Sequence, residues 1–134
     1  MSRRSFATIL VGSNALQREG LARFLHAAGF QIVASGATLP DLQADAKQQA
    51  ILLIVDSSDD SGVAVGIIEQ FKAHYPTGRV VVLGEHETPT NINSVLRAGA
   101  HIYFDKAFTC DAFIKALDMV MLGEPLEVVG YGLP

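Results

Sequence analysis

The chain has 134 residues, about the size of one compact domain, and 49% of its residues are hydrophobic while 18% are charged. This composition excludes disordered, collagen-like and mucin-like chains and is typical of a globular protein with a large core. Ten Lys and Arg residues against fourteen Asp and Glu give a net charge of −4, without a basic run. We therefore expect no direct binding of nucleic acid.

Three further features indicate the compartment. No apolar run approaches the roughly 20 residues of a membrane span, so we expect no membrane partner. The N-terminal run Phe6–Val11 resembles a first strand more than a signal peptide. The single cysteine, Cys110, excludes an intrachain disulfide and a cysteine-based zinc site. Together these features predict a cytoplasmic protein.

Short apolar segments alternate with segments of helical periodicity along the chain, without a repeat or a low-complexity tract. Gly29, Tyr75-Pro76 and Gly123 end three of the helical segments. In chain order, the predicted elements are strand Phe6–Val11, helix 16–28, strand 30–34, a short weak helix 40–47, strand 51–55, helix 63–74, strand 80–83, helix Pro89–Ala98, strand 102–104 and helix 113–122.

Five strands alternating with five helices predict an α/β fold of three layers, in which helices cover both faces of a parallel sheet. Right-handed crossovers favour the flavodoxin-like strand order 2-1-3-4-5. Ligands of such sheets bind at the carboxyl ends of the strands. The residues that follow the strands are therefore candidates for a site, and among them Asp56 and Lys106 are expected to face one crevice and form an ion pair.

Three parts of the sequence resemble the receiver domains of two-component response regulators, of the CheY-like superfamily and its NarL/LuxR-type branch. These are the segment 18–21 (Arg-Glu-Gly-Leu), Asp56 after the third strand, and the segment 99–106 around the fifth. The resemblance implies that Asp56 matches the aspartate phosphorylated by a histidine kinase. It implies that Lys106 matches the lysine that contacts the phosphoryl oxygens, and that Tyr103 matches the aromatic residue that rotates on activation.

The sequence departs from this pattern at three positions. Gly12 and Ser13 stand where the family has two acidic Mg²⁺ ligands, and Gly84 stands where it has a Thr or Ser that bonds the phosphoryl group. Mg²⁺ prefers carboxylate oxygens, and phosphoryl transfer relies on the ion to neutralise charge. We therefore interpret the chain as a degenerate receiver, not an enzyme, with no cofactor unless Asp56 binds Mg²⁺ weakly.

Two alternatives stay open. One is a functional receiver phosphorylated on Asp56 with Mg²⁺, and the other is a signalling domain that binds a small anion beside Lys106, in the space left by Gly12, Ser13 and Gly84. Tyr103 is interpreted equally well as a switch or as a packed aromatic residue. Solvated loops better explain three less specific candidates, Asp59, Asp60 and Glu85-His86-Glu87. Cys110 is better explained as a plain small residue.

The resemblance also bears on domains and partners. It covers nearly all of residues 1–123, which predicts a receiver-like domain there and leaves 124–134 as a tail or the start of a linker to an absent effector domain. The implied partners are a protein or an effector domain, and a histidine kinase if Asp56 is phosphorylated. Homodimerisation or docking is expected through the helices predicted at Pro89–Ala98 and 113–122.

Overall fold

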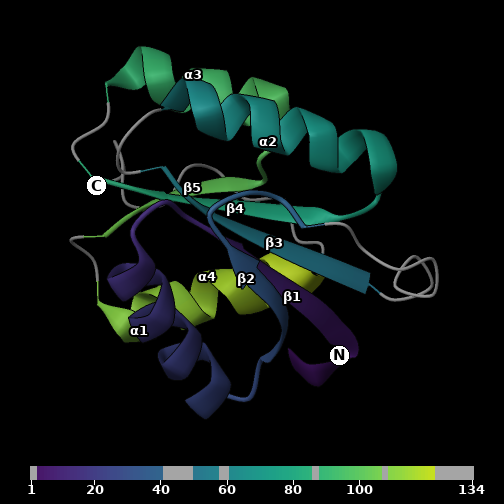
Figure 1. Cartoon of the computed structure of the whole chain (residues 1–134), viewed down its shortest axis with the longest axis vertical. Helices are drawn as coiled ribbons and strands as arrows, with labels where there is room; N and C mark the ends of the chain where they lie inside the picture. Colours follow the sequence, from purple (N-terminus) through teal and green to yellow (C-terminus); the bar gives the residue numbers. More distant parts are fainter. Residues whose placement is uncertain (1–2, 41–49, 58–60, 86–87, 107–108, 123–134) are drawn as a thin grey trace.

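A five-stranded parallel sheet forms the middle layer of the protein, seen in a computed structural model that describes residues 3–40, 50–57, 61–85, 88–106 and 109–122 (Figure 1). The strand order is β2-β1-β3-β4-β5, and every neighbouring pair is parallel. The strands are β1 Phe6–Val11, β2 Gln31–Gly36, β3 Ala50–Asp56, β4 Arg79–Gly84 and β5 Ile102–Asp105. The predicted α/β class and the predicted order 2-1-3-4-5 are confirmed.

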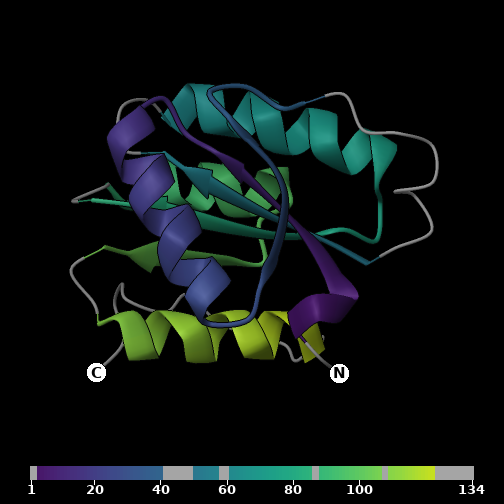
Figure 2. The ribbon, with the colours of Figure 1, turned by 60° about the horizontal axis from the view of Figure 1, so that its bottom comes forward.

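Helices cover both faces of this sheet, with α1 and α4 on one face and α2 and α3 on the other (Figures 1 and 2). Within the described residues, no helix is long and apolar enough to cross a membrane. The helix predicted at 40–47 lies, from residue 41 onward, outside the described residues. The α-helices are α1 Ala15–Ala27, α2 Ser61–His74, α3 Pro89–Ala98 and α4 Cys110–Leu122, and a short 3-10 helix, η1, spans Arg3–Ser5.

Alternation of side chains along the strands divides the core into two clusters. In β4, Val81 and Leu83 pack toward α1 and α4, whereas Val80 and Val82 pack toward α2 and α3. β1 and the middle of β3 are buried throughout, as expected of parallel strands covered on both faces. The same alternation sends Tyr103 of β5 to the α2/α3 side and Phe104 to the α1/α4 side.

Arg3 joins the first described residues to both helices of one layer. Its guanidinium donates two hydrogen bonds to the carboxylate of Asp118 in α4, at 3.0 and 2.9 Å, and one to the carbonyl oxygen of Ala28 after α1, at 2.6 Å. It also lies 5.5 Å from the ring centroid of Phe30. A planar guanidinium is suited to such multiple contacts, which hold η1 against the α1/α4 layer.

We expect stability to depend on pH through His101, at the start of β5. The ring Nδ1 atom of His101 accepts the backbone N–H of Val80 at 3.1 Å, and the backbone N–H of His101 donates to the Val80 carbonyl oxygen at 2.8 Å. Burial lowers the pKa of His101 below its usual 6.5, and the positive charges of Lys72 and Arg79 lower it further. The unfolded chain then binds the proton more readily, so the free energy of unfolding should fall as pH drops below about 6.5.

Urea unfolding between pH 7.5 and 5.0 measures this dependence. His101→Gln should have a shallower pH dependence over that interval than the parent protein. His26→Gln, at an exposed position of α1, controls for the loss of an imidazole from the surface. Equal slopes for His101→Gln and the parent protein would contradict the assignment.

Candidate functional site

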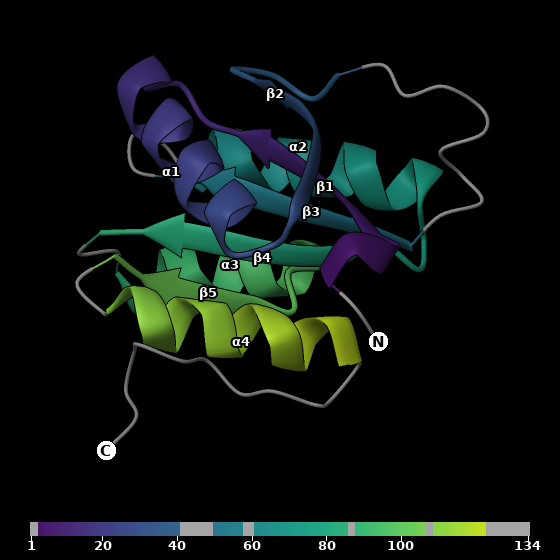
Figure 3. The same ribbon diagram turned by 90° about the horizontal axis from the view of Figure 1, so that it is seen from below.

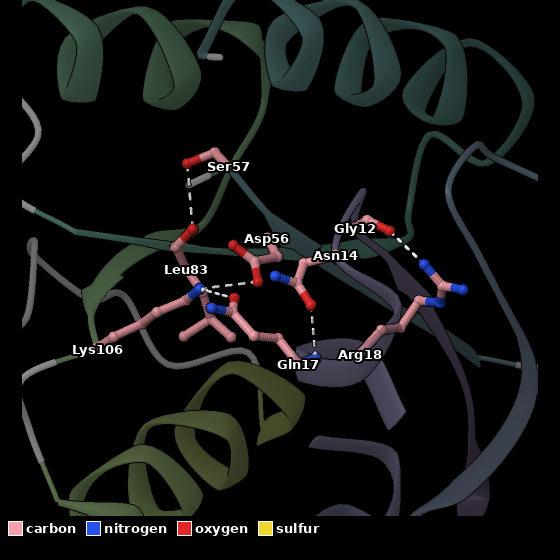
Figure 4. Close-up of polar contacts among 8 residues, drawn as sticks. All are labelled: Gly12, Asn14, Gln17, Arg18, Asp56, Ser57, Leu83 and Lys106. Atoms are coloured by element: carbon pink, nitrogen blue, oxygen red, sulfur yellow. Dashed lines mark hydrogen bonds and ion pairs between the residues drawn. The ribbon is translucent and has the colours of Figure 1, made fainter. Parts of the chain in front are cut away.

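The carboxyl ends of β3 and β5 bring two of the predicted site residues together (Figure 4). Asp56 is the last residue of β3, and Lys106 directly follows β5. Lys106 Nζ lies 2.8 Å from Asp56 Oδ2, and the two side chains are only 20% and 14% exposed. The ion pair expected from the sequence is therefore present, largely shielded from water. Shielding strengthens such a pair and also makes it costly to break.

A third residue, Gln17, belongs to this contact and was missed by sequence reasoning. Lys106 Nζ also donates to Gln17 Oε1 at 2.8 Å, so one ammonium group connects β3, β5 and the first turn of α1. The sequence does carry a relevant signal. Asn14 followed three residues later by Gln17 is a capping-box pattern, and Asn14 Oδ1 does accept the Gln17 N–H at 3.0 Å. The pattern explains the helix start, but it does not indicate the contact with Lys106.

Gly12 lies directly against Asp56. A Cβ atom added to Gly12 would lie 3.0 Å from the Asp56 Cβ and 3.9 Å from Asp56 Oδ2. The backbone of Gly12 is fixed on both sides, because its N–H donates to Gly36 and its carbonyl oxygen accepts from Arg18. A cavity of about 140 Å³ is lined by Gly12, exposed Ser13 and Asp56. Gly12 and Ser13 thus share one cavity with Asp56.

The described residues around this cavity offer Mg²⁺ one carboxylate and otherwise neutral oxygen atoms. Asp56 provides the carboxylate, and one of its oxygens already binds Lys106. The Asn14 side-chain oxygen caps α1, and Ser13 offers a neutral hydroxyl. Within the described ranges, no group of three or more His, Cys, Asp and Glu side chains is arranged to hold a metal ion. Mg²⁺ is usually held by one or two carboxylates together with phosphate and water.

Some of the less specific candidates lie outside the described residues. These are Asp59 and Asp60 after β3, and His86 and Glu87 after β4. Cys110 lies within the described residues. It is the first residue of α4 and carries an exposed, free thiol.

Tyr103 occupies the space that a side chain at position 84 would need. A Cβ atom on Gly84 would overlap the Tyr103 hydroxyl oxygen and lie 2.7 and 2.8 Å from two of its ring carbons. The Tyr103 side chain is 1% exposed and packs in the cluster that includes Ile92 and Val95 of α3. The packed interpretation of Tyr103 therefore describes this structure, and the inward ring depends on glycine at position 84.

The hydroxyl group next to Asp56 along the chain is directed away from it. Ser57 is buried, and its hydroxyl donates to the Leu83 carbonyl oxygen at 3.1 Å (Figure 4). The backbone N–H of Ser57 donates to the same oxygen at 2.8 Å. Both bonds fasten the end of β3 to β4, so Ser57 fixes the position of Asp56 through the backbone.

No protein-family model matches the chain, and a search of curated protein sequences also finds no match. Solved structures do resemble it. The isolated REC domain of RcsB from Salmonella enterica serovar Typhimurium, determined with phosphomimetic BeF3−, aligns at a TM-score of 0.71 with 21% identity over 91% of this chain and 92% of that one. A LuxR-family two-component response regulator from Aurantimonas sp. SI85-9A1 aligns at 0.74 with 18% identity over 95% and 91%.

The chain also resembles part of a longer solved protein. ChrA, the response regulator of a heme-sensing two-component system, aligns at a TM-score of 0.70 with 19% identity over 91% of this chain. The chain covers only 59% of that protein. At identities of only 18–21%, the TM-scores of 0.70–0.74 establish a shared fold. The chain has the fold of the CheY-like receiver domains of response regulators.

Proposed function

We propose that this chain is a pseudo-receiver of two-component signal transduction, which acts through protein–protein contacts with weak or no phosphorylation. The observation that carries the proposal is the site around Asp56: the acidic residue and Lys106 form their pair, while Gly12 and Ser13 supply no carboxylate beside it. Phosphoryl transfer depends on positioning and on neutralising the charge of the transferred oxygens. A single carboxylate that already binds Lys106 is a poor basis for that chemistry.

The arrangement at Gly84 supports the same proposal. A hydroxyl at this position would bond a phosphoryl group in the family, whereas here Tyr103 fills the space that such a side chain would need. The Asp56–Lys106 pair then acts as a structural contact between β3 and β5. Removing one partner of a buried ion pair is costly. This cost accounts for the presence of both residues without any role in phosphoryl transfer.

Intact-mass spectrometry after incubation with acetyl phosphate and Mg²⁺ tests the proposal. We expect the mass of the protein to stay unchanged. The double variant Gly12→Asp/Ser13→Asp should gain Mg²⁺ affinity and accept a phosphoryl group. Because a Cβ at position 12 approaches Asp56 to 3.0 Å, Ser13→Asp alone is the less strained form of this control. A stable phosphoryl adduct on the parent protein, lost in Asp56→Asn, would contradict the proposal.

The phosphoacceptor alternative is favoured by one observation, the close approach of Lys106 to Asp56 at the ends of their strands. It requires Mg²⁺ to bind at Asp56 with a dissociation constant below the millimolar range. The small-anion alternative has less support. Among the described residues, those that line the cavity beside Gly12 and Ser13 include the Asp56 carboxylate and no cationic side chain. Lys106 lines a different pocket and is bonded to Asp56 and Gln17.

The proposed output is a contact with a partner protein, an effector domain or a second copy of the chain, through α3 and α4. Met119 and Leu122 of α4 are 42% and 59% exposed and offer apolar contact area on this helix. We place the receiver-like domain at residues 1–123 and treat 124–134 as a tail or linker. A histidine kinase would be a partner only under the phosphoacceptor alternative, and the protein is proposed to be cytoplasmic.

A further inference from the structure

A pocket of about 330 Å³ is lined by residues of α1 and of the start of α4. These two helices cover the same face of the sheet (Figure 3). The walls of the pocket are mainly apolar and come from Leu21 and Phe24 of α1, Phe104 of β5 and Phe113 of α4. Pockets of about 300–1,000 Å³ with such walls are typical of sites for small molecules. A partner helix or strand would be expected to rest on a longer groove.

The polar groups of the pocket determine the charge of a suitable ligand. Lys106 and Asp56 both line it, and their charges compensate each other at 2.8 Å. An anionic ligand would compete with the 14%-exposed Asp56 carboxylate for Lys106, and loss of the ion pair would leave that carboxylate without its cation. That loss is costly in a shielded site, so the pocket favours an uncharged ligand.

Two other side chains determine the hydrogen-bonding character of the ligand. Gln17 uses its Oε1 atom to accept from Lys106, and its amide N–H groups are donors. Thr109 uses its Oγ1 atom to accept the N–H of Ala112 at 3.1 Å, and its hydroxyl hydrogen can donate. Both residues line the pocket. The polar groups there are therefore mainly donors, which suit a carbonyl or another neutral acceptor.

Gly20 leaves this pocket wider than most helical residues would. It lies inside α1 and lines the pocket, and a Cβ atom added to it would meet no neighbouring atom within 4 Å. Glycine within a helix lowers stability relative to alanine, and no contact inside the described chain requires glycine here. A side chain at this position would instead extend into or across the pocket.

From these observations we infer that the pocket binds a small, uncharged and mainly apolar molecule that carries a hydrogen-bond acceptor such as a carbonyl. The inference goes beyond the proposed signalling function. Its test uses neither Mg²⁺ nor a phosphodonor, so its outcome is independent of whether Asp56 is phosphorylated.

Binding of 2-acetylnaphthalene, followed by ¹H–¹⁵N NMR, provides the test. We expect saturable shift changes at the amides of Gly20, Leu21 and Cys110, and weaker binding of the charged analogue 2-naphthoate. A second readout uses Cys110, the single cysteine, which lines the pocket. The bound compound should slow the reaction of its thiol with an aromatic disulfide reagent.

Two glycine variants provide matched controls. Gly20→Leu should weaken binding by about tenfold or more, because the side chain takes up pocket volume. Gly66→Leu in α2 should leave binding unchanged, since Gly66 is also an exposed helical glycine without neighbours within 4 Å but lies outside the pocket lining. Both variants should raise the midpoint of urea unfolding, which separates lost binding from lost folding.

Several results would overturn the inference. These are the absence of saturable shifts at the pocket amides, equal binding to Gly20→Leu and the parent protein, or tighter binding of 2-naphthoate. A further outcome is that the shifts of the same amides change with protein concentration when no compound is present. This result would assign the pocket to contact with a second copy, and the inference would be wrong.

Discussion

Replacing Gly84 by alanine is expected to lower the free energy of unfolding by about 3 kcal/mol, at the upper end of the range for overpacked cores. The added Cβ would overlap the Tyr103 hydroxyl and come within 2.7 and 2.8 Å of two ring carbons. Since Tyr103 is almost fully buried, its ring can relieve the overlap only by leaving the cluster on the α2/α3 side. Urea unfolding monitored by circular dichroism measures the loss.

The origin of this loss can be isolated with Tyr103→Leu, which removes the ring. In that background Gly84→Ala should cost much less, with a coupling energy of at least about 1.5 kcal/mol, as found for residues in direct contact. Gly66→Ala is the matched glycine control and should stabilise the protein by about 0.5–1 kcal/mol, since the exposed site has room for a Cβ. If Gly84→Ala is as stable as the parent protein, the inward position of Tyr103 is wrong.

Replacing Lys106 by methionine is expected to cost about 2–3 kcal/mol, somewhat below the 3–5 kcal/mol typical of fully buried pairs. Methionine keeps an apolar chain of similar length but leaves the Asp56 carboxylate without its cation. The expected cost lies below that range because the side chains of Lys106 and Asp56 remain 20% and 14% exposed, so water screens part of the charge. Chemical denaturation at pH 7 measures the change.

The double variant Asp56→Asn/Lys106→Met should recover most of that loss, because the charge that needs a partner is removed as well. Gln17→Ala is a matched control on the same ammonium group. It removes one neutral acceptor at 2.8 Å and should cost no more than about 1 kcal/mol. A Lys106→Met variant as stable as Gln17→Ala would show that the ion pair contributes little to the fold.

The sheet was predictable because its strands are short apolar runs with helical segments between them. All five strands and four of the helices lie where the sequence predicts them, with end points shifted by a few residues. The largest shift at a strand is in β2, which spans Gln31–Gly36 instead of 30–34. Its exposure alternates along an edge strand, so hydrophobicity marks its ends poorly, and Phe30 is buried just before it.

The candidate site was predictable only in part. Asp56 and Lys106 follow strands whose carboxyl ends meet at one edge, so topology alone brings them together. The contact of Lys106 with Gln17 depends on a side-chain rotamer at the start of α1, and no periodicity encodes it. The fit of Tyr103 over Gly84 depends on the register of β4 and β5, in which Tyr103 pairs with Val82, two residues before the glycine.

The hydrogen bonds that Arg3 donates to Asp118 and Ala28 also constrain the order in which the chain can complete its fold. Arg3 and Asp118 are separated by 115 positions in the sequence, so this contact forms only after almost the whole domain has left the ribosome. Until then, the apolar surface that receives Phe113 and Leu117 of α4 stays uncovered on a nascent chain. Docking of α4 onto η1 and the sheet is thus a late, long-range step, of the kind that slows folding of parallel α/β domains.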